Sequence, residues 1–155
     1  VMGRQLIEIE GFEKLQKSIE RAAETGQARR LLIPVLKSAA RPTLAAAKQL
    51  APVGTRIRSR TSGGKKVATY YPGNLRKSLG ILTVKDKANA SIIVAIRSGS
   101  RRKYDGYYGH MVEHGTVNSP AQPFMGPAFN KTKGMVSKKA ERGTLKVIQR
   151  QLNKI

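Results

Sequence analysis

The sequence contains no cysteine and no tryptophan, and only nine of its 155 residues are acidic. Without cysteine the chain can form neither a disulfide nor a thiolate zinc site, and it has no thiol nucleophile. No apolar run approaches the roughly 20 residues that a membrane-spanning helix needs, and the N-terminus lacks the apolar core of a signal peptide. We therefore expect a soluble chain without membrane or targeting segments. Its length suits a single domain over residues 1–155 with a real core.

The scarcity of acid leaves a large positive excess. Thirty Lys and Arg against nine Asp and Glu give a formal net charge of +21. Thirteen of these cations and one of these acids fall in residues 51–103, so the excess is concentrated in the middle of the chain. The positive electrostatic field of such an excess attracts nucleic acid or an acidic protein surface. A solvated basic face without a special partner is the alternative interpretation.

A short strand and two helices are predicted in the first third of the chain. Residues 5–10, QLIEIE, alternate apolar and polar side chains and predict the strand. Apolar residues then recur at helical spacing, and Thr25-Gly26 ends this first helix. The recurring residues are Phe12, Leu15, Ile19 and Ala22. A second apolar stripe runs from Leu32 to Leu50, where Ala51-Pro52 stops it.

The second helix contains two prolines, Pro34 and Pro42. An interior proline removes one backbone hydrogen bond and kinks a helix. Either Pro34 lies in the first turn, where proline is tolerated, or the helix bends at both prolines.

Two basic, turn-rich segments are predicted to be loops. Residues 53–66 read VGTRIRSRTSGGKK and contain no acid. In an extended conformation the alternating arginines of this segment would share one side. The segment does not fit a phosphate-binding loop, because Ser59 and Lys66 stand where that pattern requires glycine and Ser or Thr. We therefore predict a mobile basic loop over 54–66 and a second basic loop over 98–106, SGSRRKYDG.

A hairpin and a last helix complete the prediction. β-Branched runs at 81–85 and 91–97 are joined by the polar residues DKANA, which is typical of a hairpin. The C-terminal stretch is helical, with Pro127 in its first turn and with Gly134 and Gly143 weakening it. Its apolar stripe consists of Phe129, Thr132, Val136, Ala140, Val147 and Ile148.

His110, Glu113 and His114 spell H-x-x-E-H, a pattern found in some zinc hydrolases. A glycine on either side leaves barely one helical turn to hold these residues, and a third ligand would have to come from Glu141 or Asp105. Neither stands in a convincing context. No paired acids and no serine nucleophile with a base stand out either. We expect no catalytic residue, no metal site and no cofactor, and hence a protein that is not an enzyme.

Four segments in a fixed order carry a family resemblance: APVGT at 51–55, GNLRKSL at 73–79, YYGHMVEHGT at 107–116 and PAQPFMGPAF at 120–129. Together they resemble the neck or tail-completion family of long-tailed bacteriophages, over roughly residues 5–150. That family has an Ala-Pro that ends a long helix, a Leu-Arg-x-Ser-like segment, a Val-Glu-x-Gly-Thr and a proline-rich opening of the last helix. This chain differs by inserting its basic segment before Gly73.

The predicted elements indicate an α+β fold, in which a small, mostly antiparallel sheet packs against two or three helices, with an extended basic loop and a C-terminal helix. The resemblance implies a structural virion protein that forms a ring of six or twelve copies in the neck, completes the tail and joins it to the head around the DNA channel. The implied partners are head-closure or connector proteins, tail-terminator or tail-tube proteins and packaged DNA, in the virion and, during assembly, in the host cytoplasm. A free-standing basic nucleic-acid-binding protein is the alternative from another class.

The resemblance assigns family positions to ten residues: Pro52, Gly73, Leu75, Ser78, Glu113, Gly115, Thr116, Pro123, Phe124 and Pro127. His110 and His114 fall on variable positions. We expect Asn74 to cap a helix, Leu75 and Leu79 to face inward, Glu113 to act as a hydrogen-bonding or capping carboxylate, Gly115-Thr116 to form a turn, and Phe124 to be a core or interface anchor.

Eight cations are candidate contacts to DNA or to an acidic partner: Arg56, Arg58, Arg60, Lys65, Lys66, Arg101, Arg102 and Lys103. Tyr104, Tyr107 and Tyr108 lie next to the last three of these cations. They could stack on bases or serve a protein interface, and for a ring protein we favour the interface.

Overall fold

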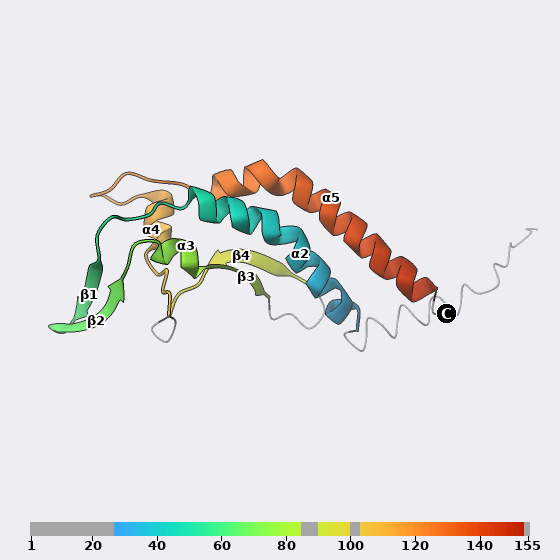
Figure 1. Ribbon diagram of the computed structural model, residues 1–155, viewed down its shortest axis with the longest axis horizontal. Helices are drawn as coiled ribbons and strands as arrows, with labels where there is room; N and C mark the ends of the chain where they lie inside the picture. Colours follow the sequence, from blue (N-terminus) through green and yellow to red (C-terminus); the bar gives the residue numbers. More distant parts are fainter. Residues whose placement is uncertain (1–26, 85–89, 100–102, 154–155) are drawn as a thin grey trace, which may run out of the picture.

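The computed structural model describes residues 27–84, 90–99 and 103–153 (Figure 1). Within these ranges the chain forms four helices and two antiparallel two-stranded sheets, which confirms the α+β class. The strands form two separate hairpins rather than one sheet. The strand expected at 5–10 and the helix expected at 12–22 lie outside the described residues. None of the described helices is long and apolar enough to span a bilayer.

Two long helices, α2 (Gln27–Leu50) and α5 (Met125–Leu152), lie side by side and run in opposite directions (Figure 1). Pro34 and Pro42 both lie inside α2, and Pro34 comes more than one turn after Gln27, so the interpretation of Pro34 as a first-turn residue is wrong. α2 is continuous through both prolines. It ends at Leu50, and Pro127 falls in the first turn of α5, both as predicted.

Small residues let the two long helices approach closely. α2 buries Ala39, Ala40 and Ala47 almost completely, together with Thr43, while α5 buries Ala128 and Thr132. Thr43 and Thr132 form a buried hydroxyl–hydroxyl hydrogen bond of 2.7 Å between the helices. At Gly143 of α5 a Cβ would overlap Cγ1 of Val35 in α2, so the predicted helix-weakening glycine is also a contact point between the helices. Phe129, at the start of the predicted stripe, is exposed.

The second hairpin pairs β3 (Leu79–Thr83) with β4 (Ile92–Ile96) and lies under α2 (Figure 1). This confirms the hairpin predicted from the β-branched runs, with β3 beginning two residues earlier than expected. Opposite residues share one face of an antiparallel pair. Leu79 is opposite Ile96, and both contact the core cluster.

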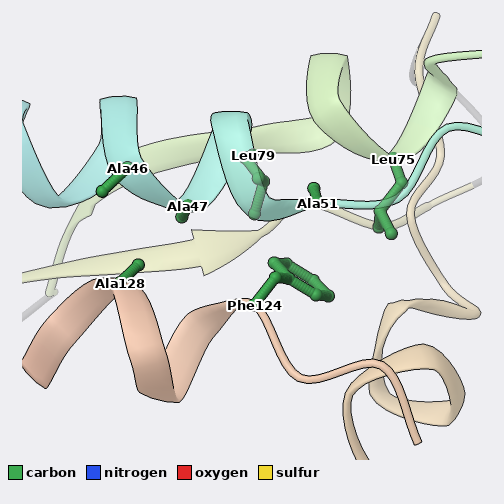
Figure 2. Close-up of a cluster of buried hydrophobic side chains, with 7 residues drawn as sticks. All are labelled: Ala46, Ala47, Ala51, Leu75, Leu79, Phe124 and Ala128. Carbon is green, nitrogen blue, oxygen red and sulfur yellow. The ribbon is translucent and has the colours of Figure 1, made fainter. Parts of the chain in front are cut away.

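The main core lies where α2 ends, α5 begins and the short helix α3 (Asn74–Ser78) meets β3 (Figure 2). Phe124 is fully buried here and confirms the predicted anchor, and Leu75 and Leu79 face inward as expected. The remaining buried members are alanines: Ala46, Ala47, Ala51 and Ala128. Phe124, Leu75 and Leu79 are therefore the large buried side chains of this core.

The first hairpin consists of β1 (Arg58–Ser62) and β2 (Lys65–Tyr70) and projects from the end of the molecule that holds α3 and the short helix α4 (Gly109–His114) (Figure 1). The predicted basic loop over 54–66 therefore contains two strands that the prediction missed, β1 and the start of β2. Gly63 and Gly64 turn the chain with positive φ values of 56° and 73°, which allows the two polar strands to pair.

Candidate docking surface at the hairpin end

We define the hairpin end as the surface formed by β1, β2, α3, α4 and the segments 51–57 and 103–108 that connect to them. Its most distinctive side chains are the five cations predicted from the sequence. Arg58 and Arg60 lie two residues apart on β1 and share one face. Arg56 precedes β1, and Lys65 and Lys66 follow the glycine turn. All are exposed except Arg60, which is half-buried.

A cluster of tyrosines holds the base of the hairpin. Tyr70, the last residue of β2, packs against Tyr107 and Tyr108 with ring centroids 5.6 and 5.5 Å away. The guanidinium of Arg60 lies 4.6 Å from the centroid of the Tyr107 ring, a cation–π contact. The hairpin is therefore fastened to the body by aromatic packing, and at least one of its arginines is oriented by this packing.

Asp105 connects the same elements through hydrogen bonds. Its carboxylate accepts from the Tyr70 hydroxyl at 3.2 Å and from the backbone N–H groups of Gly99 and Tyr107 at 3.0 and 3.2 Å. Burial raises the pKa of Tyr70, and the nearby negative charge of Asp105 raises it further while Arg60 lowers it in part. The Tyr70 hydroxyl is therefore protonated at neutral pH and remains a donor to Asp105.

Asn74 has a different role from the expected one. The N-cap position of α3 is Gly73, which has a φ of 78° that favours glycine. Asn74 is buried inside the first turn, and its side-chain amide donates to the backbone carbonyl of Asp105 at 2.6 Å and to the Tyr108 hydroxyl at 3.3 Å. The capping prediction for Asn74 is wrong because its side chain holds the 105–108 segment instead.

Glu113 is a capping carboxylate, as predicted, but for a helix outside its own segment. Its Oε2 accepts from the backbone N–H groups of Phe124 and Met125 at 2.8 and 2.9 Å, and its Oε1 accepts from Gly126 N–H at 3.0 Å. These are N–H groups that the first turn of α5 cannot satisfy internally. Two of the motifs quoted from the sequence, VEHGT and PFMGP, are thus joined by three hydrogen bonds.

The environment of Glu113 favours its ionised form. Burial raises the pKa of this carboxyl, but the three backbone donors and the charge of His114 lower it by more in total, so the pKa lies below its ordinary value. A glutamate that caps a helix with both oxygens is poorly placed to polarise a metal-bound water. His110 directs Nδ1 to the carbonyl oxygen of Tyr107 at 2.9 Å. No group of three or more potential metal ligands occurs among the residues that the structure describes.

Other motif residues shape the body behind the hairpin end. Ser78 is fully buried, and its hydroxyl donates to the Leu75 carbonyl at 2.7 Å. Gly115 has a φ of 78° and starts the turn in which Thr116 and Ser119 form an isolated β-bridge. Pro52 is half-buried, whereas Thr116, Pro123 and Pro127 are exposed.

Two arginines that the sequence reasoning did not single out hold backbone carbonyls. Arg76 donates to the carbonyl oxygens of Ala51 and Gln49 at 2.9 and 3.2 Å and so caps the C-terminus of α2. Arg97 donates from Nε to the Ser78 carbonyl at 3.0 Å. The partners of both arginines are far away in the sequence, so only the Leu-Arg-x-Ser pattern itself could have drawn attention to Arg76.

A groove of about 730 Å³ lies between the hairpin and α4. Its lining includes three arginines of the basic segment, the three clustered tyrosines and Met111 of α4. The arginines are Arg56, Arg58 and Arg60. Arginine, tyrosine and methionine are the residue types enriched at protein interfaces, and arginine and tyrosine are frequent among their energetic hot spots.

Exposed apolar side chains gather at the same end. Of the thirteen large apolar side chains that are exposed in the described residues, seven belong to the hairpin end or adjoin it: Leu50, Val53, Ile57, Val67, Tyr71, Met111 and Val117. Such a concentration of apolar side chains among cations is typical of a docking surface.

The second basic loop contributes less to the described surface. Arg101 and Arg102 lie outside the described residues. Tyr104 has the ammonium groups of Lys77 and Lys103 at 5.2 and 5.7 Å from its ring centroid, so this ring is already engaged by cations. Tyr107 and Tyr108 pack edge to face at 5.6 Å. All three rings predicted to stack on bases or to serve an interface thus have partners within the chain.

Comparison with known proteins bears on the same region. Residues 13–115, more than half of the chain, match the HK97-gp10-like family, which is described as "Bacteriophage HK97-gp10, putative tail-component". The match covers α2, both hairpins, α3 and α4, and it ends before α5. No curated protein and no solved structure matches the chain. This chain belongs to the HK97-gp10-like family of bacteriophage tail components.

Proposed function

We propose that this tail component is a structural protein of the phage neck, which works as a subunit of a homo-oligomeric ring and joins the tail to the head around the DNA channel. The observation that supports this role is the hairpin end, where a cationic hairpin projects from the body beside a groove and a set of exposed apolar side chains. A surface of this kind is suited to an extensive contact with a neighbouring protein.

The charges of the described residues indicate what kind of surface the neighbouring protein presents. The described residues contain 21 cations and only three carboxylates, Asp105, Glu113 and Glu141. Two of these carboxylates are already engaged by hydrogen bonds within the chain. The hairpin ends of two copies therefore repel each other, and the hairpin end is complementary to an acidic surface of another neck protein. Head-closure or connector proteins and tail-terminator or tail-tube proteins are the proposed neighbours, and packaged DNA is a further candidate.

The proposed role is assembly rather than catalysis, in the virion and, before that, in the host cytoplasm. The residues with the most specific geometry at this end form caps and clamps: Glu113 on α5, Arg76 on α2 and Asn74 on the 105–108 segment. Each stabilises a junction between elements. This use of polar groups suits a protein that must keep one shape while large neighbours bind to it, and the proposal requires no cofactor or metal.

The ring can be tested directly on the purified protein. We expect particles well above the monomer mass, with six or twelve copies, in native mass spectrometry and in electron micrographs, either alone or together with the neighbouring neck proteins. A subunit that stays monomeric at high concentration and in the presence of these proteins would contradict the ring.

A free-standing nucleic-acid-binding role is the second candidate, and the net charge of +21 favours it. The salt dependence of DNA binding distinguishes the two roles. A dedicated DNA binder that makes six or more phosphate contacts loses roughly 1,000-fold or more in affinity between 50 and 200 mM salt. Tight, steeply salt-dependent binding of duplex DNA by a monomer would support this second role against the ring.

A further inference from the structure

One edge of strand β1 has no backbone partner among the residues that the structure describes. β1 pairs only with β2, in a sheet of two strands. None of the backbone hydrogen bonds that join loops, turns and helix ends in the described ranges involves a residue of β1. In a paired strand, alternate residues direct their N–H and C=O groups away from the partner. The outer side of β1 is therefore an open edge, to which another strand can add.

The groove at the hairpin end follows this open edge. Four successive residues of β1, from Arg58 to Thr61, line the groove, whereas β2 contributes only its last residue, Tyr70. Successive side chains of a strand point to opposite faces of the sheet. A groove that touches four residues in succession therefore runs along the edge of β1 rather than over one face of the hairpin. The rest of the lining includes Met111 and Val112 of α4.

The charges along the groove select the kind of strand that can add to β1. Arg56, Arg58 and Arg60 line the groove, and none of its other described lining residues is charged. Arg58 is exposed, and the half-buried Arg60 is held over the Tyr107 ring. Cations on an edge strand deter pairing with a strand of the same charge. A second copy of this hairpin is therefore a poor occupant, whereas an acidic strand is complementary to the groove.

The spacing of the two strand arginines fixes where the acids of the occupant must stand. Arg58 and Arg60 share one face of the hairpin with Tyr70, which is opposite Arg58. An added strand rises by the same ~3.3 Å per residue and presents alternate side chains on that face. Two acids at positions i and i+2 of the added strand therefore lie opposite or diagonal to the two arginines. The other face of β1 has the neutral side chains of Ser59 and Thr61, so the residue between the acids needs no charge.

We propose that an extended acidic segment of a neighbouring neck protein binds in this groove by adding to β1 as a third strand, with acids at alternate positions facing Arg58 and Arg60. Backbone hydrogen bonds to β1 supply affinity and the alternate acids supply specificity. Each arginine can hold a carboxylate with two parallel N–H donors. Duplex DNA matches the charge but has no amide backbone to pair with the strand edge. The choice of a neck protein as the source of the strand rests on the proposed function, whereas the binding site rests on the geometry of the hairpin.

Short peptides test the strand addition on the purified protein. The probe is a seven-residue peptide that alternates threonine and glutamate, with glutamate at its second, fourth and sixth positions. Its control isomer has the same composition but no two glutamates two residues apart. We expect the probe to bind about ten-fold tighter than the isomer in a fluorescence polarisation titration, because only the probe places an acid at each arginine. Equal binding of the two peptides would show that net charge alone attracts them and overturns the proposal.

Two further measurements on the unaltered protein examine the backbone pairing. Hydrogen exchange followed by mass spectrometry should slow in the β1 segment when the probe binds, because the N–H groups of the open edge then donate to the peptide. A version of the probe with every backbone nitrogen methylated keeps its charge but has no N–H donor, and we expect it to lose at least about ten-fold in affinity. Unchanged exchange in β1, or undiminished binding of the methylated probe, overturns the strand addition.

Variants of the protein locate the site. We expect R58S/R60S to weaken binding of the probe about ten-fold, while the control K131Q/K133Q removes the same charge from exposed positions of α5 and changes the affinity less than about three-fold. Equal weakening by both variants overturns the proposal. Because Arg60 also packs on Tyr107, circular dichroism checks the fold of R58S/R60S, and the two measurements on the unaltered protein decide the question if this variant does not fold.

The outcome of the peptide experiments can be separated from that of the proposed function. Failure of the probe to bind or to protect β1 overturns the strand addition. The oligomer mass of the purified protein and the numbers of joined particles test the ring and the joining role, and neither measurement uses the peptides.

Discussion

Single residues at this protein's helix ends connect segments that are distant in the sequence. Glu113 caps the N-terminus of α5 with both carboxylate oxygens, and Arg76 caps the C-terminus of α2 with its guanidinium. Each charge has the sign that the helix dipole favours at that end. Hydrogen bonds with a charged partner are stronger than neutral ones, so these two side chains fix where the long helices begin and end relative to α3 and α4.

The pH dependence of stability tests the Glu113 cap. Because the folded-state pKa of Glu113 is lowered, the cap stabilises the fold above the ordinary carboxyl pKa of about 4.3, and this stability is lost as pH falls through the lower folded value. We expect E113Q to lower the free energy of unfolding at pH 7 by about 1 kcal/mol and to weaken the loss of stability in acid. Thermal melts from pH 3 to 7 measure both. Identical melting curves for the two proteins at every pH would refute the cap.

The hydrogen bond between the buried side chains of Thr43 and Thr132 has a defined donor and acceptor. The Thr132 hydroxyl donates to the Ala128 carbonyl at 2.8 Å, so Thr43 must donate to Thr132. T132V leaves the buried Thr43 hydroxyl without this acceptor and should cost about 2 kcal/mol. T43V should cost less, because Thr132 keeps its own bond, and the double variant should be close to the wild type. Urea unfolding measures all three. A larger loss for T43V than for T132V would contradict this hydrogen-bond direction, and additive losses in the double variant would contradict the hydrogen bond itself.

Elements with a clear apolar pattern were predictable from the sequence, and the others were not. α2 and α5 each show a helical apolar stripe and the β3–β4 hairpin shows two apolar runs, although Phe129 and Ile148 of the predicted α5 stripe are exposed. β1 and β2 read RSRTS and KKVATY and have no apolar face. Their pairing depends on the Gly63-Gly64 turn and on Tyr70 packing against Tyr107, a contact between distant segments. The Gly-Gly pair is itself a hairpin signal. The role of Asn74 was unpredictable because its partner is Asp105, 31 residues away.

Two glycines in α5 should respond oppositely to alanine. At Gly134 a Cβ would meet nothing within 4 Å, so G134A should stabilise the protein by up to about 1 kcal/mol through helix propensity. At Gly143 a Cβ would overlap Val35, and overpacking of about 1–3 kcal/mol should cancel or exceed the same gain. Chemical denaturation of both variants provides the comparison, with each serving as the control for the other. Equal stabilisation by both would mean that α2 and α5 do not approach closely at Gly143.

At the scale of the whole molecule, the cations form two surfaces. Three cations of α5, Lys139, Arg142 and Lys146, line a groove between α2 and α5. The hairpin end has three arginines, a tyrosine cluster and exposed apolar side chains, but in the described residues its two carboxylates are engaged internally. We therefore assign the hairpin end to a partner outside the chain and propose that this surface joins the phage tail to the head.

The most direct test counts phage particles made with an altered hairpin. The test variant replaces Arg56, Arg58, Arg60, Lys65 and Lys66 with serine, and the control replaces five exposed helical cations, Lys37, Arg41, Lys48, Lys131 and Lys133, with glutamine. Most of the test residues are exposed polar side chains, so the subunit should still fold in both cases, which circular dichroism checks. Electron micrographs of infected-cell lysates then give the numbers of free heads, free tails and joined particles. We expect mostly unjoined heads and tails for the hairpin variant and joined particles for the control, whereas normal numbers of joined, infectious particles with the hairpin variant would contradict the proposed joining role.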